Sequence, residues 1–165
     1  MNVPISVPWL ADRFPDGFVP GRAIVVTGPG GSGKPLIGNA FVASWLGAGG
    51  GVVFLSLQYP EQSFLYESYR RVIRKELDEH EERIVFVQLD TSVEGIGTGS
   101  ERMFPANVVV PDTWSAAIAR GRELIGPRLQ ATSPGIMVFA SALNLLMFSP
   151  TWREAITARL IETMG

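Results

Sequence analysis

The stretch Ala23-Ile24-Val25-Val26-Thr27-Gly28-Pro29-Gly30-Gly31-Ser32-Gly33-Lys34-Pro35 joins an apolar, β-branched run to a glycine-rich turn. The run Ala23 to Thr27 predicts a strand covered on both faces. Pro35 suits the first position of a following helix, where its missing N–H breaks no intrahelical bond. A strand, a glycine-rich turn and a helix in this order indicate an α/β fold.

The rest of the chain continues the alternation of strands and helices. Further strands are predicted at 51–57, 83–89 and 135–140, and helices at 35–46, 61–81, 113–129 and 151–164. Continuous apolar strands between helices predict a three-layer α/β/α sandwich with a mostly parallel sheet, in a single domain spanning residues 1–165.

One connection does not fit this regular alternation. Residues 90–111 form a stretch rich in Gly and Ser that is longer than compact domains usually tolerate without a purpose. A disordered crossover is the favoured interpretation, and a lid or an insertion is the alternative.

Composition limits the classes of function. The chain has 165 residues, of which 46% are hydrophobic and 18% charged, so it can bury a core. A formal net charge of -2 does not imply nucleic acid as a partner. The chain has no Cys, which excludes disulfides and thiolate metal sites. No apolar run is long enough to span a bilayer, and no leader pattern begins the chain, so we expect a cytoplasmic protein without a membrane partner.

The glycine-rich turn has the parts of a phosphate-binding loop. Its glycines let backbone N–H groups surround a phosphate, the helix N-terminus adds positive potential, and Lys34 reaches the terminal phosphates. Pro35 stands where Ser or Thr would hold Mg²⁺, and it also removes one N–H. The candidate binding residues are Gly28, Pro29, Gly30, Gly31, Ser32, Gly33, Lys34 and Pro35.

Three segments together resemble the RecA-like ATPases, and within them the KaiC-like group. They are Asp16-Gly17-Phe18-Val19-Pro20-Gly21-Arg22 before the first predicted strand, Val53-Phe54-Leu55-Ser56-Leu57-Gln58-Tyr59-Pro60, and Ile136-Met137-Val138-Phe139-Ala140-Ser141-Ala142-Leu143-Asn144. The resemblance runs from about residue 7 to the end of the chain. It implies a RecA-like domain that binds ATP, with the last segment in the place of the Walker B strand.

The chain departs from that family at the metal and catalytic positions. The family's Mg²⁺-holding Thr falls on Pro35, its Walker B Asp on Ala140, and its two activating carboxylates on Leu57 and Gln58. Hydrolysis needs a metal at the phosphates and a group that orients the attacking water. The resemblance therefore implies a pseudo-ATPase that holds ATP or ADP weakly, without dependence on Mg²⁺ and with no catalytic residues.

Two alternatives to a pseudo-ATPase stay open. In the first, the loop binds no nucleotide and the chain is a structural or regulatory subunit. In the second, less favoured, an unexpected carboxylate such as Glu61, Asp90 or Glu94 supports ATP hydrolysis.

The same resemblance bears on partners. In the family, the strand after the Walker B strand and its helix lies beside the phosphate-loop strand, whereas this chain ends at Gly165 after the predicted helix. Either the sheet is truncated to fewer strands, or another chain fills the gap, since unpaired strand edges invite partners. We therefore expect a homo-oligomer, or a partner protein that completes the sheet. A mean hydropathy of +0.19 also favours buried subunit contacts.

Overall fold

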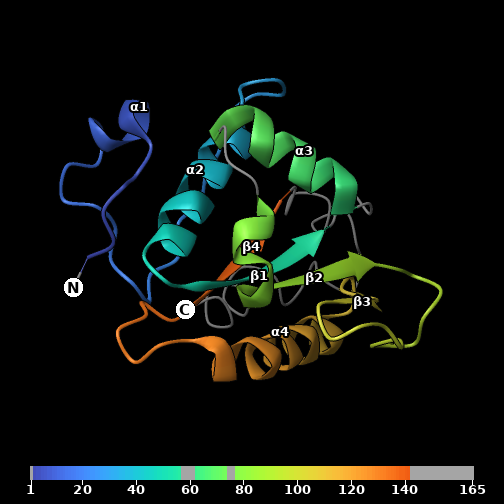
Figure 1. Ribbon diagram of the computed structural model, residues 1–165. Coiled ribbons are helices and arrows are strands. Elements are labelled where there is room, and N and C mark those ends of the chain that lie inside the picture. Colours follow the sequence, from blue (N-terminus) through green and yellow to red (C-terminus); the bar gives the residue numbers. More distant parts are fainter. Residues whose placement is uncertain (1, 57–61, 74–76, 142–165) are drawn as a thin grey trace.

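The described part of the chain forms a sheet of four strands, all parallel. The computed structural model of the protein describes residues 2–56, 62–73 and 77–141, and everything below concerns those residues. The strands are β1 (Gly51–Ser56), β2 (Ile84–Leu89), β3 (Met103–Ala106) and β4 (Ile136–Ala140), in the order β3-β2-β1-β4 (Figure 1). The predicted α/β fold with a mostly parallel sheet is confirmed.

Helices cover both faces of the sheet. α2 (Lys34–Gly47) and α3 (Gln62–Ile73) lie on one face, and α4 (Pro111–Ile125) lies on the other (Figure 1). Every residue of β1 is buried. Val52 and Phe54 pack into the core on the α2 side, while Val53 and Leu55 pack into the core on the α4 side. The strand is a continuous apolar run because successive side chains enter two different cores.

The N-terminal segment, residues 2–20 with the short helix α1 (Pro8–Ala11), packs against α2. Val3 pairs with Phe18 in an antiparallel bridge, and Phe18 stacks on Trp45 of α2 at 5.6 Å between ring centroids. The Ser6 amide donates to Ser44 Oγ at 2.9 Å. These contacts cover the side of α2 away from the sheet, so residues 38–46 of the helix are all buried.

The prediction of a buried strand at Ala23–Thr27 is wrong. The segment belongs to no strand, and the side chains of Ile24 and Val25 are 41% and 69% exposed. Its backbone makes no hydrogen bond to the backbone of any other described residue. Within the described chain the sheet ends at β4, so no neighbouring strand pairs with these residues. β-Branched side chains favour extended backbone, but a strand also needs a partner for its N–H and C=O groups.

The helices also differ from the predicted ones in extent. The helix predicted at 61–81 is α3 followed by a separate 3₁₀ helix, η1 (Leu77–Arg83). The one predicted at 113–129 is α4, which starts at Pro111, followed by the short 3₁₀ helix η2 (Gly126–Arg128). The helix predicted at 151–164, and the positions Leu57 and Gln58, lie outside the described residues.

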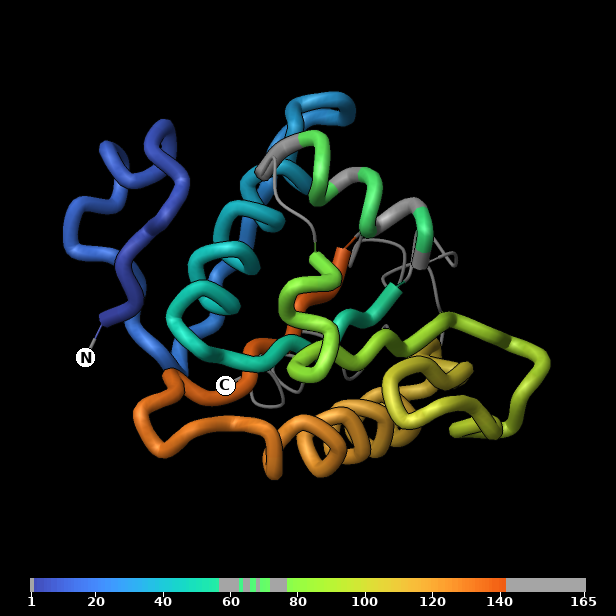
Figure 2. Tube along the Cα trace, viewed as in Figure 1, coloured from blue at the N-terminus to red at the C-terminus, as the bar shows by residue number. Residues whose placement is uncertain are grey.

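The stretch 90–111 is not a disordered crossover, because it contains β3. The chain leaves β2 in a wide loop and returns to run beside it, as Figure 2 shows. Ile96 then pairs with Ala106 in an antiparallel bridge, and the Gly97 amide donates to the Pro105 carbonyl at 2.8 Å. The loop therefore covers the outer edge of β3. The sequence did not predict β3, because the stretch is rich in Gly and Ser and the strand forms by pairing with β2, which is not a local property.

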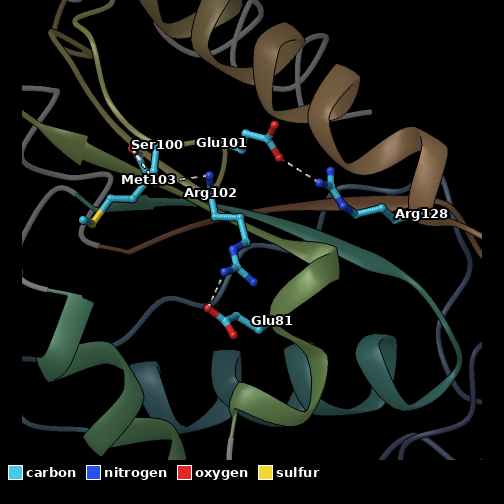
Figure 3. Close-up of polar contacts among 6 residues, drawn as sticks. All are labelled: Glu81, Ser100, Glu101, Arg102, Met103 and Arg128. Carbon is cyan, nitrogen blue, oxygen red and sulfur yellow. Dashed lines mark hydrogen bonds and ion pairs between the residues drawn. The ribbon is translucent and has the colours of Figure 1, made fainter.

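Polar contacts also connect the loop to the elements around it (Figure 3). Arg102 pairs with Glu81 of η1 at 3.0 Å, and Arg128 of η2 pairs with Glu101 at 3.0 Å. All four side chains are well exposed, so each pair adds little stability. Burial of Phe104 at 0% exposure contributes more.

Candidate functional site

The glycine-rich loop lies at the start of α2. It projects from the body of the molecule as the light blue turn at the top of Figures 1 and 2. Gly33 is the N-cap of α2 with φ of 76°, in the left-handed region where glycine is favoured. Gly28 to Ser32 are exposed to solvent. The predicted loop-to-helix junction is therefore present, although the strand predicted before it is not.

The Lys34 side chain folds back onto the loop. Its Nζ donates to the carbonyl oxygens of Gly28 at 2.8 Å and Pro29 at 2.6 Å, and to Ser32 Oγ at 3.4 Å. Ser32 Oγ in turn donates to the Pro29 carbonyl at 2.8 Å. These bonds close the loop around the ammonium group and hold a positive charge at its centre.

Several amides of the loop remain available to a ligand. The N–H groups of Gly30, Gly31, Gly33 and Lys34 donate to no backbone carbonyl among the described residues. Leu36 and Ile37 already donate to the Gly33 carbonyl, and Pro35 has no N–H. These four amides lie at the N-terminus of α2, where the helix dipole is positive.

The packing of α2 places the loop at one end of β4. A Cβ on Gly38 would lie 2.5 Å from Cε2 of Phe139, and Trp45 Nε1 donates to the Gly135 carbonyl at 3.2 Å. The helix therefore runs antiparallel to β4, with Lys34 toward the carboxyl end of the strand. In open α/β sheets, ligands bind outside the carboxyl ends of the strands.

Ala140 is the last residue of β4, so it lies at that same end. Its methyl group can neither coordinate a metal nor orient a water molecule, whatever occupies the loop. The structure thus brings the loop and Ala140 to one end of the sheet.

Of the carboxylates considered as unexpected catalysts, Asp90 lies at the same carboxyl end of the parallel sheet as Ala140, but not on a neighbouring strand. Asp90 follows β2, which is separated from β4 by β1. Its carboxylate accepts hydrogen bonds from the hydroxyl and the amide of Ser92, which lowers the pKa of Asp90. Glu94 lies in the same loop, and Glu61 is outside the described residues.

Sequence reasoning missed one further feature. An open depression of about 360 Å³ is lined by Ser63 and Tyr66 of α3 and by Asp78 and Glu81 of η1. Its lining comes from the stretch that the sequence analysis assigned to one continuous helix. The depression lies between α3 and η1, and no sequence signal indicated that the predicted helix would be two elements.

Comparison of the chain with protein-family models, curated proteins and solved structures gives no match. In the described part of the chain, no cluster of three or more His, Cys, Asp or Glu side chains has the arrangement to hold a metal ion. None of the helices described is both long enough and apolar enough to cross a bilayer.

Proposed function

We propose that this chain is a RecA-like nucleotide-binding domain that holds ATP or ADP weakly and hydrolyses it slowly or not at all. The phosphates bind the loop from Gly28 to Lys34, and the preference for adenine follows from the family resemblance alone. The observation that carries the proposal is the junction of an exposed glycine-rich loop with α2, with four uncommitted amides and the Lys34 ammonium at one place.

The order of the strands supports the RecA-like assignment. In the family that the chain resembles, the strand after the Walker B strand and its helix lies inside the sheet, beside the phosphate-loop strand. β4 corresponds to the Walker B strand, and Ala23–Thr27 does not pair with it. In the described residues β4 forms one edge of the sheet, which leaves its outer side open to a further strand.

Binding without turnover follows from the residues around the loop. Pro35 offers no hydroxyl to Mg²⁺, and Ala140 offers no carboxylate. A hydrogen bond to a charged group contributes about 1.5–3 kcal/mol, so the N–H absent at Pro35 weakens phosphate binding roughly ten- to a hundredfold. We expect dissociation constants on the order of micromolar to millimolar, with little change on adding Mg²⁺.

Calorimetric titration of ATP and ADP, with and without Mg²⁺, tests the proposal. Lys34→Ala should abolish binding and leave the unfolding midpoint unchanged, because the side chain lies in an exposed loop. Arg13→Ala, which removes an exposed cation elsewhere, is the matched control and should bind like the wild type. If Lys34→Ala binds ATP as tightly as the wild type, the loop is not the site and the proposal fails.

A second candidate function is a structural or regulatory subunit that binds no nucleotide. Two observations favour it: Lys34 already has three acceptors within the loop, and β4 forms one edge of the described sheet. It predicts no heat of binding at millimolar nucleotide. It also predicts that a homo-oligomer or a complex with a partner protein completes the sheet, which sedimentation of the purified chain, alone and with a candidate partner, would detect.

A further inference from the structure

The hydrogen-bonding capacity of Lys34 is fully used within the loop. An ammonium group has three N–H donors, and the structure gives it three acceptors. Two are backbone carbonyls, of Gly28 and Pro29, at 2.8 and 2.6 Å. The third is Ser32 Oγ at 3.4 Å. A phosphate that reaches Lys34 must therefore displace one of these acceptors.

The bond to Ser32 is the one that opens most easily. It is the longest of the three, and hydrogen bonds weaken with distance. The Ser32 hydroxyl gives its own hydrogen to the Pro29 carbonyl at 2.8 Å, so it meets Lys34 as an acceptor. Gly28 leaves room for this arrangement, since a Cβ there would lie 3.0 Å from Ser32 Oγ and 4.0 Å from Lys34 Cδ.

We propose that Ser32 is a latch on Lys34 that lowers the affinity of the loop for phosphate. In the ligand-free loop, the Ser32 hydroxyl holds the third N–H of the ammonium. A terminal phosphate of a nucleotide or of a free polyphosphate takes over that N–H, while the bonds to the Gly28 and Pro29 carbonyls persist. The inference rests on the proposed function, because it assumes that the loop binds phosphate.

The latch and a direct role of Ser32 predict opposite changes in phosphate affinity when the Ser32 hydroxyl is removed. If the hydroxyl itself donated to the bound phosphate, its removal would weaken binding. If it competes for Lys34, its removal frees one donor and strengthens binding. Since the competing bond is long, we expect Ser32→Ala to lower the dissociation constant about three- to tenfold.

The experiment titrates inorganic tripolyphosphate and, in parallel, ATP into the full chain by calorimetry. Ser32→Ala should bind both ligands more tightly by the same factor, because the latch concerns the phosphates and not the base. Ser115→Ala is the matched control: Ser115 is also exposed, and its hydroxyl donates to the Pro111 carbonyl in α4. The double variant Ser32→Ala, Lys34→Ala should lose binding altogether.

The possible results separate the latch from the proposed function. The latch is supported if Ser32→Ala binds phosphate more tightly than the wild type, or if Ser32→Ala binds and the wild type shows no binding. Equal or weaker binding by Ser32→Ala, with Lys34-dependent binding in the wild type, overturns the latch and leaves the proposed function in place. No binding of either ligand by the wild type or by Ser32→Ala overturns the proposed function, and the latch with it.

Discussion

The Arg83 guanidinium reaches the carbonyl oxygen of Leu46 at 3.0 Å, and so joins the end of η1 to the end of α2. It also donates to the Gly50 carbonyl at 2.5 Å. The last carbonyls of a helix have no intrahelical partner and carry partial negative charge, so a cation there stabilises the helix. This contact fixes the far end of the helix that presents the candidate loop.

Arg83→Met should lower the free energy of unfolding by about 1.5–3 kcal/mol, because partly buried carbonyls lose a charged donor. Urea denaturation of the variant and the wild type measures this change. Arg13→Met, at an exposed position, should cost less than about 0.5 kcal/mol. Equal midpoints for Arg83→Met and the wild type would show that the guanidinium does not cap α2.

Gly121→Ala should destabilise the protein even though alanine favours helices. A Cβ on Gly121 of α4 would lie 2.7 Å from Cγ2 of Val53, which is fully buried in β1 and has a stiff, branched side chain. Overpacking of this kind costs about 1–3 kcal/mol. In Gly47→Ala the added methyl meets no atom within 4 Å, so that variant should be neutral or slightly more stable. Thermal unfolding of both variants checks the contrast.

The exposure of Val25 predicts that its substitution has little effect on stability. Val25→Ala should change the free energy of unfolding by less than about 0.5 kcal/mol, because the side chain is 69% exposed. Val53→Ala, at 0% exposure in β1, should cost about 2–3 kcal/mol. A cost for Val25→Ala as large as that for Val53→Ala would mean that the segment is buried as a strand in solution.

Tyr69 predicts how stability depends on alkaline pH. Burial, helped by the negative charge of Glu79, raises the pKa of Tyr69 to about 12. In the unfolded chain the phenol ionises near its ordinary pKa of about 10. The unfolded state therefore loses its proton first, so stability is intact below about pH 10 and falls as pH rises toward 12. Ultraviolet absorbance of tyrosinate should show a titration near pH 12 that Tyr69→Phe removes, and Tyr69→Phe should make unfolding less sensitive to pH in this range.

Much of the fold could be predicted from the sequence. The apolar runs at β1, β2 and β4 are surrounded by helical patterns, and both features are local properties of the chain. The junction of the glycine-rich loop with α2 was equally predictable, since Gly33 tolerates the left-handed backbone of the N-cap and Pro35 fixes its own φ. In these places local propensity and tertiary environment agree.

Other features could not be predicted because they depend on pairing between distant residues. β3 contains Pro105 and follows a Gly- and Ser-rich loop, yet its register against β2 makes it a strand. Ala23–Thr27 has the stronger strand composition, yet it has no described strand to pair with. Composition sets the preference for extended backbone, whereas a neighbouring strand decides whether that backbone joins a sheet.

The sequence by itself determined the α/β class, the loop and its lysine, because these follow from side-chain periodicity and from the backbone preferences of glycine and proline at their own positions. Only the tertiary structure decided where Lys34 points and that α2 runs antiparallel to β4, with the loop toward Ala140. The physical reason is that the orientation of α2 depends on hydrogen bonds and packing contacts between residues that are far apart in the chain. No local pattern contains that choice.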